Sequence, residues 1–596
     1  MRIADALVTT LRDLDTRYVF GVSGANIEHF HDAVERLGRG RLSAVLTKRE
    51  DGAAFMADAR ARVHRTLGVC CSTSGGGMMN LVAGLAESHA ESVPVLALVG
   101  QPPAALDGRG SFQDSSGIGR TVDALPLLAA VTKKTLRLTD PALFWAQLRD
   151  AIETALSGRM GPVALLVPRD SYELEVGPVP ADWPQDLAGF VRQKPWDDKD
   201  AADVAALFRR LREASAPVLL IGHGVRRSTD PGAVVRFAQQ AGIPVMTTMG
   251  ARGEFPNDDP LHFGVVGAGG NPSAAAYLTD TADCVVLAGT GLAAMTRSAL
   301  RGWDPGKAVA VNIDPGEIRR SSLADTVVEG DAGVVFGQLL ELLDTDPFTA
   351  PPAVGYELTR FVPRLAEPIP GRDADPDVLL QSEAVAILEE HLPADGHLLY
   401  DAGNCAVASM HYSSVPRGSS STIALGSGGM GYSIAAAVGA QLGADRGTRT
   451  VVFCGDGAFL MSGLEIHTAV ELGLPILYVV FNNGMHGMCA SRQQTFFDSR
   501  ITAVDYTPVD VPAVARGLGS PGRLWTGSAG TAPELTGQLE EYRRSACPTG
   551  VLELRLTTEE VPPFANFLPA DEPTMPAKTS WRIPASLRSA GTMTPA

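Results

Sequence analysis

Short apolar runs alternate with longer amphipathic stretches along most of the chain. Such runs are typical of buried strands in a parallel sheet, and the amphipathic stretches are typical of the helices that cover it. The clearest unit begins at Val451, where an apolar run ends in Gly455-Asp456-Gly457. A helical stretch follows, and a second apolar run ends in Asn482-Asn483. This pattern predicts strand, loop, helix and strand.

Polar side chains stand where both of these predicted strands end. The carboxyl ends of parallel strands are ligand-binding edges, because helix N-termini and free backbone N–H groups meet there. Asp456 and Asn483 would supply two hard oxygen atoms, which suits Mg²⁺ with a phosphate-bearing ligand. Gly457 and Ala458 lack bulk, so backbone N–H groups can approach phosphate oxygens. The alternative is a plain βαβ unit in which Gly-Asp-Gly only makes a tight turn.

The same alternation of strands and helices occurs three times, and two polar, proline-containing linkers near residues 181–200 and 346–376 separate the repeats. We therefore predict an α/β protein with three doubly wound parallel-sheet domains. Their expected limits are 1–180, 200–345 and 376–560, followed by a C-terminal tail at 561–596 that we interpret as mobile or as a lid.

Composition and charge narrow the classes of function. The 596 residues are too many for one hydrophobic core. A formal net charge of −17 argues against nucleic acid or an anionic membrane as the main partner. The seven cysteines have no Cys-x-x-Cys spacing and are expected to be reduced. No signal peptide or membrane-length apolar run is evident, so we expect a cytoplasmic protein.

Several segments carry a resemblance to a known family. FGVSGANIEHF, KREDGAAFMADARAR, TSGGGMMNLVAGLAES, SVPVLALVGQ and GPVALLVPRD, together with the Gly-Asp-Gly to Asn-Asn motif, resemble thiamine diphosphate enzymes of the acetolactate synthase and benzoylformate decarboxylase family. The likeness is to acetolactate synthase large subunits and covers roughly residues 1–560. It implies a pyrimidine-binding, a central and a diphosphate-binding domain, with thiamine diphosphate and Mg²⁺ as cofactors.

The resemblance assigns the cofactor contacts residue by residue. The implied metal ligands are Asp456, Asn483 and the backbone carbonyl of Met485. Met430, in the loop Gly426 to Gly431, matches the bulky residue that bends the cofactor. The full set of implied cofactor-binding residues is Glu50, Gly403, Asn404, Gly428, Met430, Gly455, Asp456, Gly457, Ala458, Asn483, Met485 and His486.

Three residues are candidates for catalysis. Glu50 matches the glutamate that hydrogen-bonds the aminopyrimidine and favours its imino form, which supplies the base for the cofactor's C2. Its alternative role is a first-turn residue stabilised by the helix dipole. Gln113 could orient the reacting carbonyl or be a polar loop residue. His486 could move protons near neutral pH or be a solvated loop histidine.

Substrate contacts are implied for Ala25, Asn26, Gln113 and Arg492. Arg492 stands where acetolactate synthases carry tryptophan, and its guanidinium could hold a carboxylate. Acetolactate synthases hold FAD in the central domain. Here the third central strand is followed by Gly291-Leu292-Ala293-Ala294-Met295 in place of Arg-Phe-Asp-Asp-Arg, so FAD is doubtful and we expect a structural domain. The family's cofactor lies across a subunit interface, which implies a homodimer or homotetramer.

The predicted reaction is decarboxylation of a pyruvate-like 2-oxo acid, with transfer of the acyl anion equivalent to a second carbonyl. Two alternatives remain open from the sequence. One is a 2-oxo acid decarboxylase that releases an aldehyde without ligation. Such enzymes often use histidines to protonate the intermediate, and His29, His31, His89 or His486 could serve. The other is a cofactor-binding but inactive or regulatory homologue.

Overall fold

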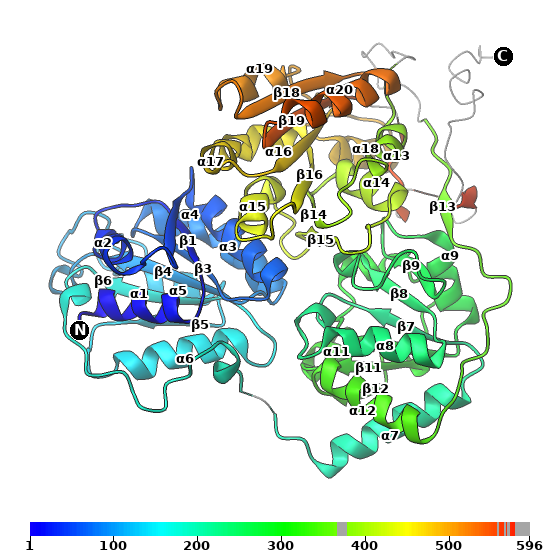
Figure 1. Ribbon diagram of the computed structural model, residues 1–596, viewed down its shortest axis with the longest axis horizontal. Helices are drawn as coiled ribbons and strands as arrows, with labels where there is room; N and C mark the ends of the chain where they lie inside the picture. The colour runs from blue at the N-terminus through cyan, green and yellow to red at the C-terminus, as the bar shows by residue number, and fades with distance from the viewer. Residues whose placement is uncertain (193, 366–377, 557–559, 566–567, 569–571, 578–596) are drawn as a thin grey trace. The chain divides into compact units, whose positions relative to one another are not determined.

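The computed structural model describes residues 1–192, 194–365, 378–556, 560–565, 568 and 572–577 (Figure 1). The chain forms two compact units. Unit 1 comprises Met1–Gln193, Ala424–Thr450 and Ala458–Ile476, and unit 2 comprises Lys194–Ile423, Val451–Gly457 and Leu477–Ala596. Among the described residues, no helix combines the length and apolar character that a bilayer crossing requires.

Unit 1 is built on a six-stranded parallel sheet with the order β2-β1-β3-β4-β6-β5. Its strands are β1 (Tyr18–Gly21), β2 (Ser43–Leu46), β3 (Gly68–Ser72), β4 (Val95–Gln101), β5 (Lys134–Arg137) and β6 (Val163–Pro168). Its helices are α1 (Ile3–Asp13), α2 (Glu28–Leu37), α3 (Glu50–His64), α4 (Gly76–Ala90), α5 (Ala124–Ala129) and α6 (Phe144–Leu156). The strand order reverses between β1 and β3, so their loops flank the usual ligand position of such sheets.

The segments 424–450 and 458–476 add two helices to unit 1, α15 (Tyr432–Gln441) and α17 (Ile466–Leu472). Every residue of α15 is buried, and the helix packs against α3. The two helices approach closely because Gly439 lies directly on the Met56 carbonyl and a side chain there would collide with it. Tyr432 closes the contact by donating its hydroxyl to Asp58 (2.5 Å).

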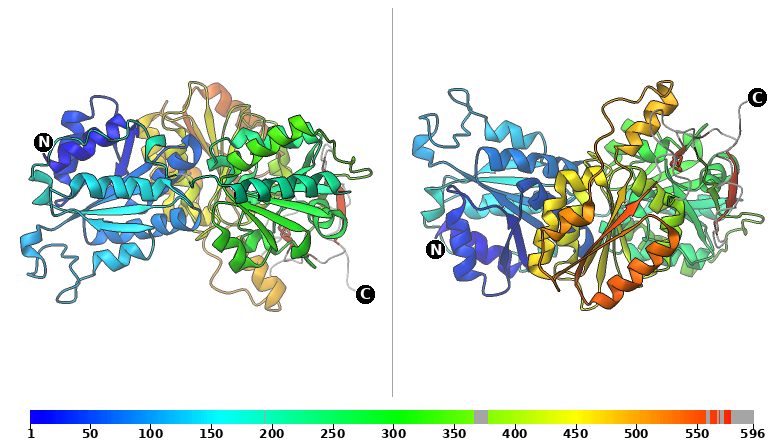
Figure 2. Two further views of the ribbon diagram at one scale, coloured as in Figure 1. Left: turned by 90° about the horizontal axis from the view of Figure 1, so that it is seen from below. Right: turned by 90° about the horizontal axis from the view of Figure 1, so that it is seen from above.

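The central sheet of unit 2 has the order β12-β11-β10-β7-β8-β9. Its residues alternate between two cores: Leu219 and Ile221 belong to one, and Val218 and Leu220 to the other. Helices therefore cover both faces, as Figure 2 shows. The elements are α7 (Asp198–Glu213), β7 (Pro217–Ile221), α8 (Pro231–Ala241), β8 (Val245–Thr248), β9 (His262–Val266), α9 (Pro272–Ala276), β10 (Cys284–Ala288), α10 (Ala294–Arg297), β11 (Ala308–Asn312), α11 (Pro315–Ser321), β12 (Thr326–Glu329) and α12 (Ala332–Thr345).

The third sheet repeats the strand order of the first, as β15-β14-β16-β17-β19-β18. Its order reverses between β14 and β16, the two strands that precede Asn404 and Asp456. The remaining elements are α13 (Gln381–Glu389), β14 (Gly396–Tyr400), α14 (Asn404–Tyr412), β15 (Ser420–Ile423), β16 (Arg449–Gly455), α16 (Asp456–Ser462), β17 (Ile476–Asn482), α18 (Gly487–Phe496), α19 (Val511–Arg516), β18 (Leu524–Ala529), α20 (Ala532–Ser545) and β19 (Thr549–Arg555).

The prediction of three doubly wound parallel sheets is confirmed. The first linker is more ordered than its composition suggested, because Trp183 and Phe190 are buried in the core of unit 1. Residues 366–376 of the second linker and 578–596 of the tail lie outside the described residues. Within the tail, β20 (Thr574–Pro576) pairs antiparallel with β13 (Thr359–Phe361).

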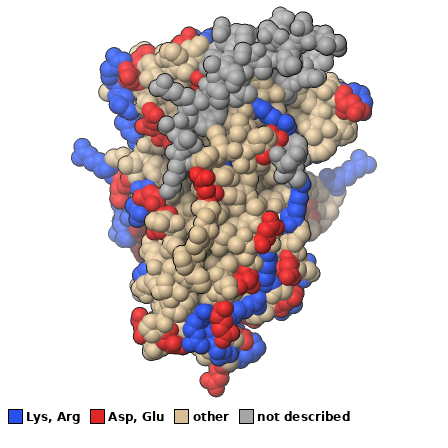
Figure 3. Space-filling view, turned by 90° about the vertical axis from the view of Figure 1, so that its right-hand side faces the viewer, with Lys and Arg blue, Asp and Glu red and all other residues tan. Residues whose placement is uncertain are grey.

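Charged side chains do not separate into a basic face on the side of the molecule drawn in Figure 3. Lysine and arginine residues lie among aspartate and glutamate residues there, around a largely uncharged centre. This distribution agrees with the net charge of −17, which gives a polyanion no general attraction to the chain.

Glu560 should make the stability of unit 2 depend on pH. It is buried and accepts backbone N–H groups of Gln381 (2.5 Å) and Ser382 (3.2 Å) at the start of α13. Burial raises the pKa of Glu560 to about 7. Because the folded pKa exceeds the unfolded one, this stability is present below pH ~4.5 and is lost as the pH rises through about 7. We expect the melting temperature of wild type to fall by a few degrees between these limits.

The comparison is a series of melting curves between pH 4.5 and 8 for Glu560→Gln and Glu390→Gln. A glutamine side chain in place of Glu560 cannot ionise, so this part of the pH dependence should disappear. Glu390 is exposed at the other end of α13 and serves as the control. An unchanged pH profile in Glu560→Gln would contradict the assignment.

Candidate active site

The predicted site residues fall into two groups, one in each unit. Unit 1 contains Ala25, Asn26, Glu50, Gln113, Gly428, Met430 and Ala458. Unit 2 contains Gly403, Asn404, Gly455, Asp456, Gly457, Asn483, Met485, His486 and Arg492.

Glu50 is the first residue of α3, and its carboxyl group lies over the N-terminus of α4. The half-buried side chain accepts a hydrogen bond from the Asn80 amide through Oε2 (2.8 Å). Its Oε1 faces Gly77, where any side chain would meet it. The preceding Arg49 is exposed and pairs with Asp51 (3.1 Å), so its charge is compensated beside it. The hydrogen bond from Asn80 therefore uses only one of the two Glu50 carboxyl oxygens.

Gly77 is expected to be essential for the position of Glu50. A Cβ atom at Gly77 would lie 2.9 Å from Glu50 Oε1, closer than such atoms pack, and 3.3 Å from Thr73 Cγ2, which is also tight. Gly77→Ala should therefore displace the carboxyl group and lower turnover by roughly tenfold or more, since small misplacements of reacting groups are costly. Gly76→Ala is the matched control, because nothing lies within 4 Å of its added Cβ. Equal steady-state rates in the two variants would refute this.

Gln113 and Asn26 meet at the loop that follows β3. The Thr73 hydroxyl donates to Gln113 Oε1 (3.1 Å), which leaves the Gln113 amide nitrogen for another acceptor. Gln113 has a left-handed backbone (φ 59°) and packs against Gly75. Asn26 is buried and its amide donates to Ser74 Oγ (2.8 Å), whereas the neighbouring Ala25 is exposed.

The glycine-rich loop before α15 is anchored at one end by a buried carboxylate. Glu87 accepts the backbone N–H groups of Gly426 (3.2 Å) and Ser427 (2.7 Å), and Arg62 lies 3.5 Å from it. Beyond this anchor, Gly428 is exposed with a left-handed backbone (φ 66°), and Met430 is half-buried. Ala458 is buried.

Asp456 begins α16 directly after β16 and is 2% exposed. Its Oδ1 accepts the N–H of Gly457 (3.0 Å) and its Oδ2 accepts the N–H of Gly484 (2.7 Å). Burial raises the pKa of Asp456, while hydrogen bonds from Gly484, Tyr506 and Gly457 oppose that shift. A carboxylate in this setting gains from a bound cation.

The side-chain amides of Asn483 and Asn404 both lie against Gly487, beside the loop that follows Asp456. A Cβ atom at Gly487 would lie 2.8 Å from Asn483 Nδ2 and 3.1 Å from Asn404 Nδ2. Asn404 follows Gly403, whose φ of 128° suits glycine, and its buried Oδ1 has no hydrogen-bond partner among the described residues. Met485 N donates to Asn483 Oδ1 (3.3 Å). The three strand-end loops therefore present Asp456, Asn483 and Asn404 from neighbouring strands, after Gly455 ends β16.

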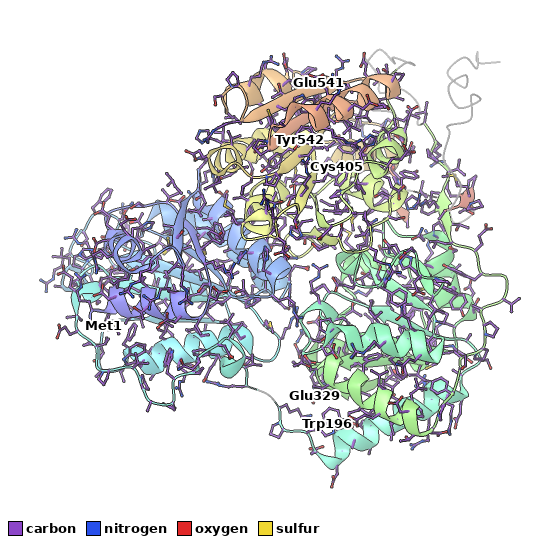
Figure 4. The ribbon with its side chains drawn as sticks, viewed as in Figure 1. Met1, Trp196, Glu329, Cys405, Glu541 and Tyr542 are labelled. Atoms are coloured by element: carbon purple, nitrogen blue, oxygen red, sulfur yellow. The ribbon has the colours of Figure 1, made fainter. Side chains whose placement is uncertain are left out.

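His486 packs edge-on against Tyr506, with the ring centres 5.5 Å apart. Its backbone N–H donates to the Val504 carbonyl (2.7 Å), and its Nδ1 is buried with no partner among the described residues. Arg492, on α18, is exposed. Cys405 lies inside the third domain at the start of α14 (Figure 4). Burial raises the pKa of its thiol, which disfavours the thiolate that a nucleophile would need.

Sequence reasoning missed three residues of these groups. Asn80 lies in the segment TSGGGMMNLVAGLAES, and its place one turn into a helix could have indicated a contact with Glu50, the first residue of α3. Tyr506 and Glu465 carried no such signal, because they reach their partners only through the tertiary fold.

Three models of one protein family match the chain in the order of its three sheets. They are the N-terminal thiamine pyrophosphate (thiamine diphosphate) binding domain over residues 1–118, the central domain over 204–339 and the C-terminal binding domain over 401–551 of thiamine pyrophosphate enzymes.

Related proteins are similar in sequence to most of this chain. The probable acetolactate synthase large subunit of Methanocaldococcus jannaschii is 32% identical over 519 residues, covering 85% of this chain and 84% of that protein. The acetolactate synthase large subunits of Corynebacterium glutamicum and Parasynechococcus marenigrum are 30% and 31% identical, each covering 87% of this chain and 81% and 82% of their own. The chain thus belongs to the thiamine diphosphate enzymes and is acetolactate synthase-like, which confirms the resemblance.

Proposed function

We propose that this enzyme decarboxylates a pyruvate-like 2-oxo acid and transfers the acyl anion equivalent to a second carbonyl, with thiamine diphosphate and Mg²⁺. The convergence of Asp456, Asn483 and Asn404 at one sheet edge, in a chain similar to acetolactate synthases over most of its length, carries this proposal. When bound, the cofactor supplies an electron sink for the bond to CO₂.

The residues of unit 2 fit a diphosphate and a divalent cation. The buried Asp456 supplies the negative charge that offsets Mg²⁺, and the Asn483 oxygen and the Met485 carbonyl would complete the protein ligands. The unpartnered Asn404 Oδ1 marks a buried polar atom that needs a donor or a cation. Gly403 and Gly457 would leave backbone N–H groups accessible to phosphate oxygens.

The residues of unit 1 fit the aminopyrimidine. Glu50 would exchange a hydrogen bond with a ring nitrogen, and Asn80 holds the other carboxyl oxygen in place. Gln113 would donate its free amide N–H groups to a carbonyl oxygen of the substrate. Arg492 is exposed and would be free to pair with an anionic group.

The contacts of three of the four candidate histidines give no support to a protonating role, so ligation stays the preferred reaction. His29 stacks on Tyr172, and His31 contacts Cys71 Sγ (3.4 Å). His89 lies in the last turn of α4, whereas Glu50 lies at its first turn, roughly 18 Å away at 1.5 Å per residue. His486 is then the remaining candidate of the four for protonating an intermediate.

The proposal is tested by product analysis. Wild-type enzyme, Glu50→Gln and a cofactor-free control would be incubated with pyruvate, alone and with a second 2-oxo acid or an aldehyde. Mass spectrometry would quantify CO₂, aldehyde and ligated products, with and without added FAD. Ligated products from wild type alone support the proposal. Aldehyde as the sole product would favour the decarboxylase, and no CO₂ from any 2-oxo acid would favour an inactive homologue.

We propose that the central domain has a structural role and holds no FAD. The strand order reverses between β10 and β7, where a dinucleotide would lie. Gly224 N donates to the Gly289 carbonyl there (3.0 Å), and a Cβ atom on Gly289 would lie 2.6 Å from Val225 N. The two loops are thus in backbone contact. Flavin absorbance in the purified protein, or an FAD requirement in the product assay, would oppose this proposal.

We also propose a homodimer or homotetramer. Leu46, Leu460, Met461 and Leu464 are each at least half exposed, which is unusual for large apolar side chains. An ion pair between Lys48 and Glu471 (2.6 Å) joins the segment that contains Leu46 to the segment that contains the other three. The four apolar residues therefore belong to one region of unit 1. Light scattering should give a multiple of the 62.5 kDa chain, and Leu464→Asp should lower it.

A further inference from the structure

The turn that leads into α3 is held by a residue from a distant part of the chain. Arg49, the residue before α3, has no side-chain hydrogen bond that caps the helix. Glu465 instead holds the turn just before the helix: its Oε1 accepts the backbone N–H groups of Lys48 (2.8 Å) and Arg49 (2.9 Å). All of these residues lie in unit 1. A carboxylate at this position also interacts favourably with the helix dipole.

Glu465 is itself tightly held. It is 4% exposed, and its Oε2 accepts a third hydrogen bond from the Thr468 hydroxyl (3.1 Å). Gly52, in the first turn of α3, leaves the space for the carboxylate, because a Cβ atom there would lie 2.5 Å from Oε1. Burial raises the pKa of Glu465, and the N–H donors of Arg49 and Lys48 counteract this shift. The side chain is therefore an ordered buried acceptor.

We infer that Glu465 is a positioning residue for Glu50. This inference rests on the proposed function, in which Glu50 faces the cofactor. Glu50 directly follows Arg49, so any change in the backbone at Arg49 redirects the Glu50 side chain. The hydrogen bond between Asn80 and Glu50 (2.8 Å) fixes the far end of that side chain, and Glu465 fixes its backbone. Both contacts are needed, because a small displacement of a catalytic group lowers the rate strongly.

The chain offers a matched control on the same segment. Glu471 lies six residues after Glu465 and also contacts Lys48, but it pairs with the side-chain Nζ (2.6 Å) and not with the backbone. It is about half exposed. Glu471→Gln removes the same charge from the same neighbourhood and leaves the turn before α3 untouched.

The first experiment needs no cofactor. Amide hydrogen exchange of the apo-protein, followed by mass spectrometry of peptides that span Lys48 and Arg49, reports directly on their N–H groups. Glu465→Gln keeps the shape but replaces a charged acceptor with a neutral amide oxygen, which holds the two N–H groups more weakly. These two amides should then exchange at least tenfold faster than in wild type, and Glu471→Gln should match wild type. Wild-type protection in Glu465→Gln would overturn the inference.

Gly52→Ala should disturb the same contact without any change to Glu465. The added methyl group would displace the Glu465 carboxylate without removing its charge. It should reproduce the faster exchange of the Lys48 and Arg49 amides. This variant also decides the question if Glu465→Gln fails to fold.

The second experiment separates positioning from a general loss of structure. Exchange of the C2 proton of bound thiamine diphosphate in D₂O, which needs no substrate, would be measured for wild type, Glu465→Gln, Glu50→Gln and the double variant. If Glu465 acts through Glu50, Glu465→Gln should slow exchange at least tenfold in wild type and by less than twofold in Glu50→Gln.

Two outcomes would count against the idea in different ways. Equal slowing in both backgrounds would overturn the role of Glu465 and leave the proposed function standing. Absence of C2 exchange in wild type would overturn the proposed function, and the catalytic meaning of the contact with it.

Discussion

Asp456→Asn is expected to abolish Mg²⁺-dependent binding of thiamine diphosphate while leaving the protein folded. The carboxylate is 2% exposed, and burial raises its pKa, so a neutral side chain of equal size costs the fold only one of the hydrogen bonds from Gly457 and Gly484. The same substitution removes the proposed charge that holds the cation. We expect the dissociation constant for the cofactor with Mg²⁺ to rise roughly 100-fold or more, which corresponds to ~3 kcal/mol.

Titration calorimetry with and without EDTA measures this effect. Asp510→Asn is the control: Asp510 is exposed, caps α19 through Ala513 N (2.8 Å), and an asparagine can still cap the helix. Its neighbour Val509 accepts a hydrogen bond from Asn482 at the end of β17 (3.0 Å), so the control removes a charge near the same sheet edge. Wild-type cofactor affinity in Asp456→Asn would remove Asp456 from the metal site.

Glu50→Gln should bind the cofactor normally and lose most turnover. Glutamine keeps the acceptor for Asn80 (2.8 Å in wild type) but cannot give up or accept a proton at this position. We expect release of CO₂ to fall by roughly 100- to 1,000-fold, which lies within the usual contribution of a general acid or base. Single-turnover measurements with saturating cofactor would separate this loss from weaker binding.

The neighbouring carboxylate provides the control for Glu50. Asp51 is the second residue of α3 and pairs with the exposed Arg49 (3.1 Å). Asp51→Asn changes the helix N-terminus by one charge without touching Asn80 or Gly77. It should retain turnover within about twofold, because exposed ion pairs contribute little. Full activity of Glu50→Gln would exclude Glu50 from the mechanism.

Much of the fold followed from local pattern. Apolar runs predicted the strands that the structure places at Arg449–Gly455 and Ile476–Asn482, because a buried strand needs side chains that are apolar on both faces. The packing of the first linker was less evident. Its composition suggested an exposed segment, and burial of Trp183 and Phe190 depends on a core built from residues far away in the sequence.

The sequence likewise indicated some residues of the candidate site and not others. Asp456 and Asn483 could be singled out because each follows an apolar run at a strand end, and parallel strands bring such ends to one edge. Glu50 could be singled out only through the family resemblance of its segment. Glu465 could not, since its partners lie in a distant part of the sequence. Likewise, α15 and α17 belong by sequence to the third repeat but pack in unit 1, where buried contacts such as Tyr432 with Asp58 hold them.

By itself, the sequence determined the order of strands and helices, the three repeats and the residues that recur at strand ends. These features depend on spacing over a few residues, and side-chain periodicity records that spacing directly. The tertiary structure alone decided which atoms meet: Asn80 with Glu50, Gly484 with Asp456, and Glu465 with the turn before α3. The last of these contacts joins residues more than 400 positions apart, and no local pattern encodes a hydrogen bond across that distance.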